Sequence, residues 1–376
     1  MHVWFEGVNF FAGLAKARKH YLERINLDPK FDPIVLACCV HQAFLLSNLG
    51  QIDESEAISR TCCKALGDLG LKAELSECWH NLGVNASFRG EYEASQSLLE
   101  DAIYLGKESD HILWPSYLLW LGHVYFLMGA YEDGMLTLNK CHAIFMKKGT
   151  YWGAAFALSK MGLASDGLGE HERAIRYHQS ALDVFERVEN YAGKGYCLSR
   201  MSISACHLGD YEQSKIYAEK GFQIFEVIDH HWGLSSALSC LGFAHYGLGN
   251  SQQACQAFCE ALAISNRDQM APLSLYALAG LALIMMERGQ SAQAHSLLVY
   301  VKHHPKMAKA YFDHAFCVWQ GKDLGQINFE EFTVKMTQEK PSLEGIVEEI
   351  LSMVCIKNKD FPELSTACDD GSDCHE

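Results

Sequence analysis

The chain has 376 residues, of which 49% are hydrophobic and 20% charged, so a folded chain is expected and a disordered one is excluded. Its net charge of −15 excludes sequence-independent nucleic-acid binding, which depends on lysine and arginine side chains neutralising phosphates. We find no apolar run long enough to cross a membrane and no basic leader, and expect no membrane partner and no secretory signal.

Residues 1–32 are predicted to form an N-terminal capping helix or a partial repeat. The stretch FEGVNFFAGLAKARKHYLERI resembles the second helix of a pair whose first helix is missing. This favours a fragment of a longer protein over a chain with a divergent cap.

Residues 33–304 carry a repeat with a nearly constant interval. Seven glycines mark it, and the spacings between them are 40, 39, 40, 40, 40 and 40 residues. The glycines are Gly50, Gly90, Gly129, Gly169, Gly209, Gly249 and Gly289. Glycine adopts the left-handed conformation that ends a helix, so each is predicted to be the turn between two antiparallel helices.

Small residues flank every turn glycine at fixed distances. Seven residues before it stand Ala43, Gly83, Gly122, Gly162, Ser202, Gly242 and Ala282. Five residues after it stand Ser55, Ser95, Gly134, Ala174, Ser214, Ala254 and Ala294. Small residues at facing positions let two helix axes approach closely, and one pair cannot bury its apolar faces alone. The sequence therefore predicts an all-α solenoid of seven stacked helix pairs in a right-handed superhelix.

The stretch from Trp79 to Ile103, WHNLGVNASFRGEYEASQSLLEDAI, resembles a tetratricopeptide repeat through its Trp, Leu-Gly, Gly-x-Tyr and small-residue positions. The ordinary unit has about 34 residues, whereas this one has 40. The linkers GTYWGAAFALSKMG and DHHWGLSSALSCLG also match each other. This 40-residue style is similar to the superhelical sensor regions of bacterial signal-transduction ATPases of the MalT-like (STAND) type. It is also similar to the animal LGN/Pins scaffold proteins.

After His304 the repeat phase is lost. Residues 305–358 are predicted to be C-terminal capping helices, and residues 359–376 a flexible acidic tail. The 15 cysteines form no pair of CxxC motifs, and many lie in helical patterns where cysteine behaves as a small buried hydrophobe. We expect buried thiols, no metal site, no disulfide and a cytoplasmic location.

Catalytic motifs are absent: the chain has no P-loop, GxSxG, HExxH or GxGxxG pattern. The 18 histidines are dispersed and are expected to be structural or solvated. We therefore expect no enzymatic activity, no catalytic residue and no cofactor. No basic recognition helix for nucleic acid is evident either.

What remains is a concave groove lined by the first helices of the pairs. Counted from the small residue before each turn, the inward positions carry aromatic, polar and charged side chains. The candidate ligand-binding residues are His123, Phe126, Phe156, Lys160, Asp166, Tyr196, Arg200, Phe243 and Tyr246. A local cation pair, Lys160 and Arg200, in a chain of net charge −15 favours recognition of an anionic group. Packing between neighbouring helices is the alternative for each aromatic residue.

The leading hypothesis is a recognition domain that binds a protein, peptide or small-molecule signal in this groove. The resemblance implies the sensor part of a bacterial signal-transduction ATPase or regulator, with an attached or separate effector module. The alternative is a constitutive protein–protein interaction scaffold of the LGN/Pins type.

Overall fold

The computed structural model describes residues 33–48, 51–321 and 342–355. Within them the chain forms 16 α-helices and no strand, so the all-α solenoid prediction is confirmed. The predictions for residues 1–32 and 359–376 lie outside the described residues. In the described part of the chain, no helix combines the length and the hydropathy needed to span a bilayer.

Seven pairs of antiparallel helices follow one another along the chain. The first helices are α2 (Pro33–Asn48), α4 (Lys72–Phe88), α6 (Trp114–Met128), α8 (Tyr151–Gly167), α10 (Tyr191–His207), α12 (His231–Gly247) and α14 (Ala271–Glu287). The second helices are α3 (Ile52–Asp68), α5 (Tyr92–Glu108), α7 (Tyr131–Lys147), α9 (His171–Arg187), α11 (Tyr211–Val227), α13 (Ser251–Arg267) and α15 (Ser291–His303). Two further helices, α16 (Lys309–Gly321) and α18 (Leu343–Cys355), follow the last pair.

The turn within each pair is left-handed at glycine, as the sequence predicts. The φ angle is +78° at Gly169 and +79° at Gly249, and the other turn glycines except Gly50, which is not described, have similar values. The Gly169 amide donates to the carbonyl of Asp166 at 3.0 Å and so closes the end of α8. These glycines are therefore required by backbone conformation.

The small residues near each turn allow close contact between the two helices of a pair. A Cβ atom on Gly122 would lie 2.5 Å from Leu138 of the second helix. On Gly162 it would lie 2.5 Å from the ring of His178. Where the residue after the turn is serine, it bonds to the facing backbone: the Ser95 hydroxyl donates to the Gly83 carbonyl at 2.6 Å. The predicted close approach of the two helices is thus present in these pairs.

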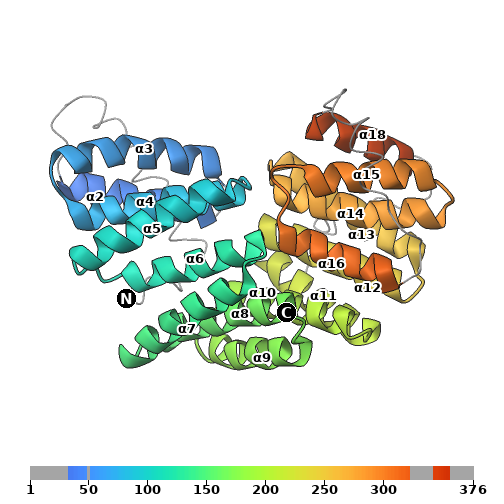
Figure 1. The fold of residues 1–376 in the computed structure, drawn as a ribbon, viewed down its shortest axis with the longest axis horizontal. Helices are drawn as coiled ribbons and strands as arrows, with labels where there is room; N and C mark the ends of the chain where they lie inside the picture. Colours follow the sequence, from blue (N-terminus) through green and yellow to red (C-terminus); the bar gives the residue numbers. More distant parts are fainter. Residues whose placement is uncertain (1–32, 49–50, 322–341, 356–376) are drawn as a thin grey trace, which may run out of the picture.

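The pairs curl into an arc, with α2 to α5 in one arm and α13 to α15 in the other (Figure 1). Helix α16 lies on the inner side of this arc, where it packs against α6, α10, α12, α14 and α15 (Figure 1). The segment before it also reaches the first arm, since the Tyr92 hydroxyl donates to the Lys306 carbonyl at 3.1 Å. Helix α18 packs against α13 and α14. Residues 309–321 therefore occupy part of the concave channel as well as contacting the last pair.

Candidate ligand-binding site

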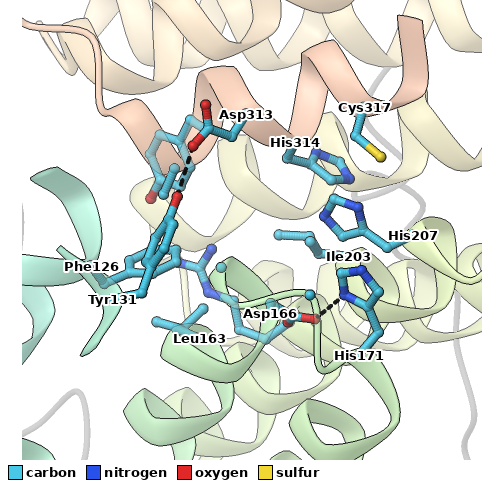
Figure 2. Close-up of a pocket in the computed structure, with 15 residues that line it drawn as sticks. Phe126, Tyr131, Leu163, Asp166, His171, Ile203, His207, Asp313, His314 and Cys317 are labelled. Carbon is cyan, nitrogen blue, oxygen red and sulfur yellow. Dashed lines mark hydrogen bonds and ion pairs between the residues drawn. The ribbon is translucent and has the colours of Figure 1, made fainter. Parts of the chain in front are cut away.

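A cavity of about 220 Å³ lies between α16 and the concave surface of the central repeats (Figure 2). Its walls come from α6, α7, α8, α9, α10 and α16. The lining residues are Phe126, Tyr131, Leu163, Asp166, Gly167, Gly169, His171, Arg200, Ile203, His207, Ala310, Tyr311, Asp313, His314 and Cys317. Residues about 190 positions apart in the sequence, such as Phe126 and Asp313, are therefore neighbours here.

Three of the nine residues predicted from the sequence line this cavity: Phe126, Asp166 and Arg200. Two others, Phe243 and Tyr246, are fully buried and do not line it. Phe243 packs between aromatic rings, with the ring centroid of Tyr276 at 5.1 Å and that of His314 at 4.8 Å. The remaining four are half-buried and do not line the cavity: His123, Phe156, Lys160 and Tyr196.

Arg200 is the most unusual of the lining residues because its guanidinium is buried. Its side chain comes from α10 and is 5% exposed. It lies over the ring of Tyr311 of α16, with Cζ 5.9 Å from the ring centroid. Tyr311 hydrogen-bonds to it, and the Asp166 carboxyl interacts with it electrostatically, although both Asp166 oxygens bond to other side chains. A buried cation whose neighbouring carboxyl is bonded to other groups is costly, so this position is a candidate for binding an anion.

Lys160 holds the equivalent position one repeat earlier but has a different environment. Its ammonium lies 4.9 Å from the centroid of the Trp120 ring, in a cation–π contact. Burial, together with the nearby Arg200 charge, lowers the pKa of Lys160 to about 7. Burial and these two cations hold the pKa of His123 well below its usual value. The two predicted cations therefore differ: one lines the cavity, and the other packs on an indole.

Asp166 is buried but is occupied by hydrogen bonds. It accepts from the Ser204 hydroxyl at 2.7 Å, and its other oxygen lies 3.0 Å from Nδ1 of His171 (Figure 2). Burial raises the pKa of this carboxyl, although both hydrogen bonds oppose the effect. Asp166 also interacts with the Arg200 charge, but its oxygens bond to Ser204 and His171.

Three histidine rings form a column along one wall of the cavity (Figure 2). The rings of His171 and His207 stack with centroids 4.4 Å apart, and His207 meets His314 of α16 at 4.7 Å. The Tyr276 hydroxyl lies 2.6 Å from Nδ1 of His314, while Nε2 of His314 and Nδ1 of His207 are buried with no hydrogen-bond partner. Burial lowers the pKa of His207 to about 3 and that of His314 far below its usual value, so both rings are neutral.

Sequence reasoning did not predict this column. His171 is two residues after the turn glycine Gly169, and His207 is two residues before the next turn glycine, Gly209. Counting positions from these glycines would have indicated that the two histidines are neighbours. His314 could not have been found this way because it follows the end of the repeats.

The opposite wall is tied to α16 by an acidic residue. The Tyr131 hydroxyl donates to the Asp313 carboxylate at 2.8 Å (Figure 2). The Lys309 ammonium lies 2.5 Å from the same oxygen. Each carboxylate in the cavity wall thus has its own cationic or hydrogen-bonding partner. Among the described residues, no group of three or more histidine, cysteine or acidic side chains is arranged to hold a metal ion.

The chain matches no protein-family model and no curated protein sequence. Solved structures resemble it. One is a Rap protein complexed with Competence and Sporulation Factor, at 13% identity and a TM-score of 0.55, covering 86% of this chain and 98% of that one. NprR in complex with its cognate peptide NprX matches at 15% identity and a TM-score of 0.55, covering 86% and 97%.

A third similar structure is the Rap conjugation gene regulator of the plasmid pLS20 in complex with the Phr* peptide. It matches at 14% identity and a TM-score of 0.57, covering 78% of this chain and 76% of that one. At these identities the likeness concerns the fold. The fold of this chain is accordingly that of the tetratricopeptide-like helical-repeat proteins.

Proposed function

We propose that this chain is a helical-repeat receptor that binds a peptide in its concave channel. The observation that carries the proposal is α16: the channel already holds a segment of polypeptide and contacts it with aromatic, hydrogen-bonding and charged side chains. Beside that segment an unfilled cavity remains, with a buried guanidinium in its wall. A surface that packs on one peptide segment and leaves space next to it is suited to binding a second one.

The comparisons support this choice of ligand class. The three solved structures described above are complexes with Competence and Sporulation Factor, NprX and the Phr* peptide. Those ligands belong to those proteins. For this chain they favour a peptide over the protein or small-molecule ligands that the sequence left open.

The proposal also covers how peptide binding is transmitted to an effector. Because α16 contacts α6, α10, α12, α14 and α15, a ligand that changes its packing would change the curvature of the arc. An attached or separate effector would read that change, and the sequence resemblance favours an ATPase or regulator of the signal-transduction type. A constitutive scaffold would bind without the change. We propose no enzymatic activity, and a location in the cytoplasm.

The test uses affinity selection from a pool of random heptapeptides, with bound peptides identified by mass spectrometry. We expect the parent protein to retain a set of related sequences. Ile203→Trp, which puts an indole into the cavity wall, should retain them at least tenfold less well. The matched control is Val227→Trp, since Val227 is 81% exposed on α11. No related set, or equal retention by parent and Ile203→Trp, contradicts the proposal.

A further inference from the structure

We infer that the cavity beside α16 binds a carboxylate group, anchored by Arg200. This inference rests on the proposed function for the ligand's location, and it adds the chemical group that is recognised. Arg200 is 5% exposed and lines the cavity, and the Asp166 carboxyl that acts on it is hydrogen-bonded to Ser204 and His171 instead. Its planar fork presents paired N–H donors, which match the two oxygens of a carboxylate.

A second feature of the same wall, independent of the guanidinium, points to a ligand. His314 is 4% exposed and its Nε2 atom is buried without a partner, although it borders the cavity. Its Nδ1 atom lies 2.6 Å from the Tyr276 hydroxyl. A phenol is a better donor than acceptor, so the Tyr276 proton belongs in this bond and the imidazole proton belongs on Nε2. That arrangement leaves an N–H donor with nothing to bond.

The charges of the other walls select a carboxylate over a phosphate. Asp166 and Asp313 also border the cavity, and each already has its own partners. A dianion would be repelled by these two carboxylates more strongly than a monoanion, and the Lys309 ammonium beside the cavity is already paired with Asp313. A single negative charge adds less repulsion from Asp166 and Asp313 and leaves their existing contacts intact.

A carboxylate could come from a peptide C-terminus, from an Asp or Glu side chain of a peptide, or from a free small acid. Two experiments separate these sources. In the first, acetate and propionate are compared with acetamide and propionamide at constant ionic strength, by the thermal stability of the full chain. We expect the acids to stabilise the parent and the amides to have no effect.

In the second experiment, one selected peptide is made with a free C-terminus, with a C-terminal amide, and with each acidic side chain replaced by its amide. We expect one of these changes to weaken binding at least tenfold. Which one does so identifies the source. Equal affinity for all the forms overturns the inference for peptides.

The variants locate the anchor. Arg200→Gln should weaken acid and peptide binding at least tenfold, and should bind the free and amidated forms equally. Arg200→Lys keeps the charge without the fork and should be intermediate, and His314→Phe should lose a few fold. The control is Arg176→Gln, which removes the same charge from an exposed position on α9. Circular dichroism checks that each variant is folded. If Arg200→Gln does not fold, the loss of binding in His314→Phe is used as the test instead.

The outcomes distinguish the inference from the proposed function. If peptide affinity changes neither when carboxylates are amidated nor in Arg200→Gln, the inference is overturned, but the proposed peptide receptor is still supported. Acid binding that depends on Arg200, without binding of any peptide, supports the carboxylate site with a free acid as its source and overturns the peptide receptor. Acid effects that are equal in parent and Arg200→Gln overturn the site.

Discussion

At the scale of single residues, the two cations show how the same position in consecutive repeats acquires different chemistry. The spacing of the turn glycines places Lys160 and Arg200 in equivalent positions, and this much could be read from the sequence. Their surroundings depend on side chains from elsewhere: Trp120 under the ammonium, and Tyr311 of α16 against the guanidinium. No local pattern specifies these neighbours, so the sequence could not separate the residue that packs from the one that faces the cavity.

The low pKa of Lys160 gives a prediction about stability and pH. The unfolded chain keeps this proton up to about pH 10.5, whereas the folded chain releases it near pH 7. Between these values the unfolded state binds more protons, so the free energy of unfolding of the parent rises as the pH rises. We expect Lys160→Met to lack this rise and to exceed the parent in stability below pH 7, by on the order of 1–3 kcal/mol.

Urea unfolding at pH 6, 8 and 9.5 measures the difference between variant and parent. Lys220→Met serves as the control, because Lys220 is exposed on α11 and the same substitution there should not change the pH dependence. If Lys160→Met follows the parent curve at all three pH values, the ammonium is not destabilised in the folded state.

The turn residues give a second prediction at this scale. Gly169 has φ +78°, and a Cβ atom there would have no heavy atom within 4 Å, so only backbone strain opposes a side chain. We expect Gly169→Ala and Gly169→Val to lower the free energy of unfolding by about 1–2 kcal/mol. Glu189 ends a second helix at φ +53°, and Glu189→Gly should act in the opposite direction by a few tenths of a kcal/mol or more.

The measurement is again urea unfolding at neutral pH. A parent-like midpoint for both Gly169 variants would mean that this turn tolerates any residue. It would also remove the physical reason for the spacing of the glycines.

At the scale of the helix pair, the sequence predicts the internal turn well and the linker between pairs poorly. The internal turn needs a positive φ and has glycine every time, so the pattern is visible. The linkers also need a positive φ, but four of them use Asp110, Glu189, Asp229 and Gln269, at φ from +49° to +54°. Because polar side chains tolerate this region at modest cost, the positions leave no glycine signal to find.

Packing within a pair depends on a small residue facing a larger one. Gly122 lies against Leu138, which is fully buried, whereas the same positions of the fifth repeat hold Ser202 and Ala218. The first residue is larger and the second smaller, so the total volume is kept. We expect Gly122→Ser to cost about 1–3 kcal/mol and Leu138→Ala about 2–5 kcal/mol when each is made alone.

The double variant recreates the pair of the fifth repeat, so its cost should fall below the sum by at least about 0.5 kcal/mol. A control cycle joins Gly122→Ser to Leu298→Ala, a buried position in the seventh repeat. The free-energy changes of those two substitutions should be additive. Additivity in both cycles would show that Gly122 is small for some reason other than contact with Leu138.

At the scale of the whole molecule, the placement of α16 is what the sequence could not predict. The periodicity identifies seven pairs because each pair contacts its neighbours in the chain. Helix α16 lacks the repeat phase, and its partners lie as far away as α6. Residues 305–358 were predicted as caps on the last pair, and nothing in their pattern indicated that α16 lies in the channel. The candidate site was therefore predicted only in its repeat half.

The position of α16 leads to a prediction about the shape of the arc. Tyr311 packs against Tyr276 and Arg200, and His314 bonds to Tyr276 and meets His207, so these two side chains hold α16 to the central repeats. We expect Tyr311→Ala combined with His314→Ala to loosen α16 and open the arc. Small-angle X-ray scattering should show a larger radius of gyration, and amide hydrogen exchange should rise in α6 and α10 but not in α3, which packs against α2 and α4. A selected peptide added to the parent should produce a change of the same kind if the receptor signals through curvature. If the double variant shows faster hydrogen exchange in α16 alone and an unchanged radius of gyration, α16 does not maintain the curvature of the arc. A peptide that binds with no change in radius or exchange would then favour the scaffold over the sensor.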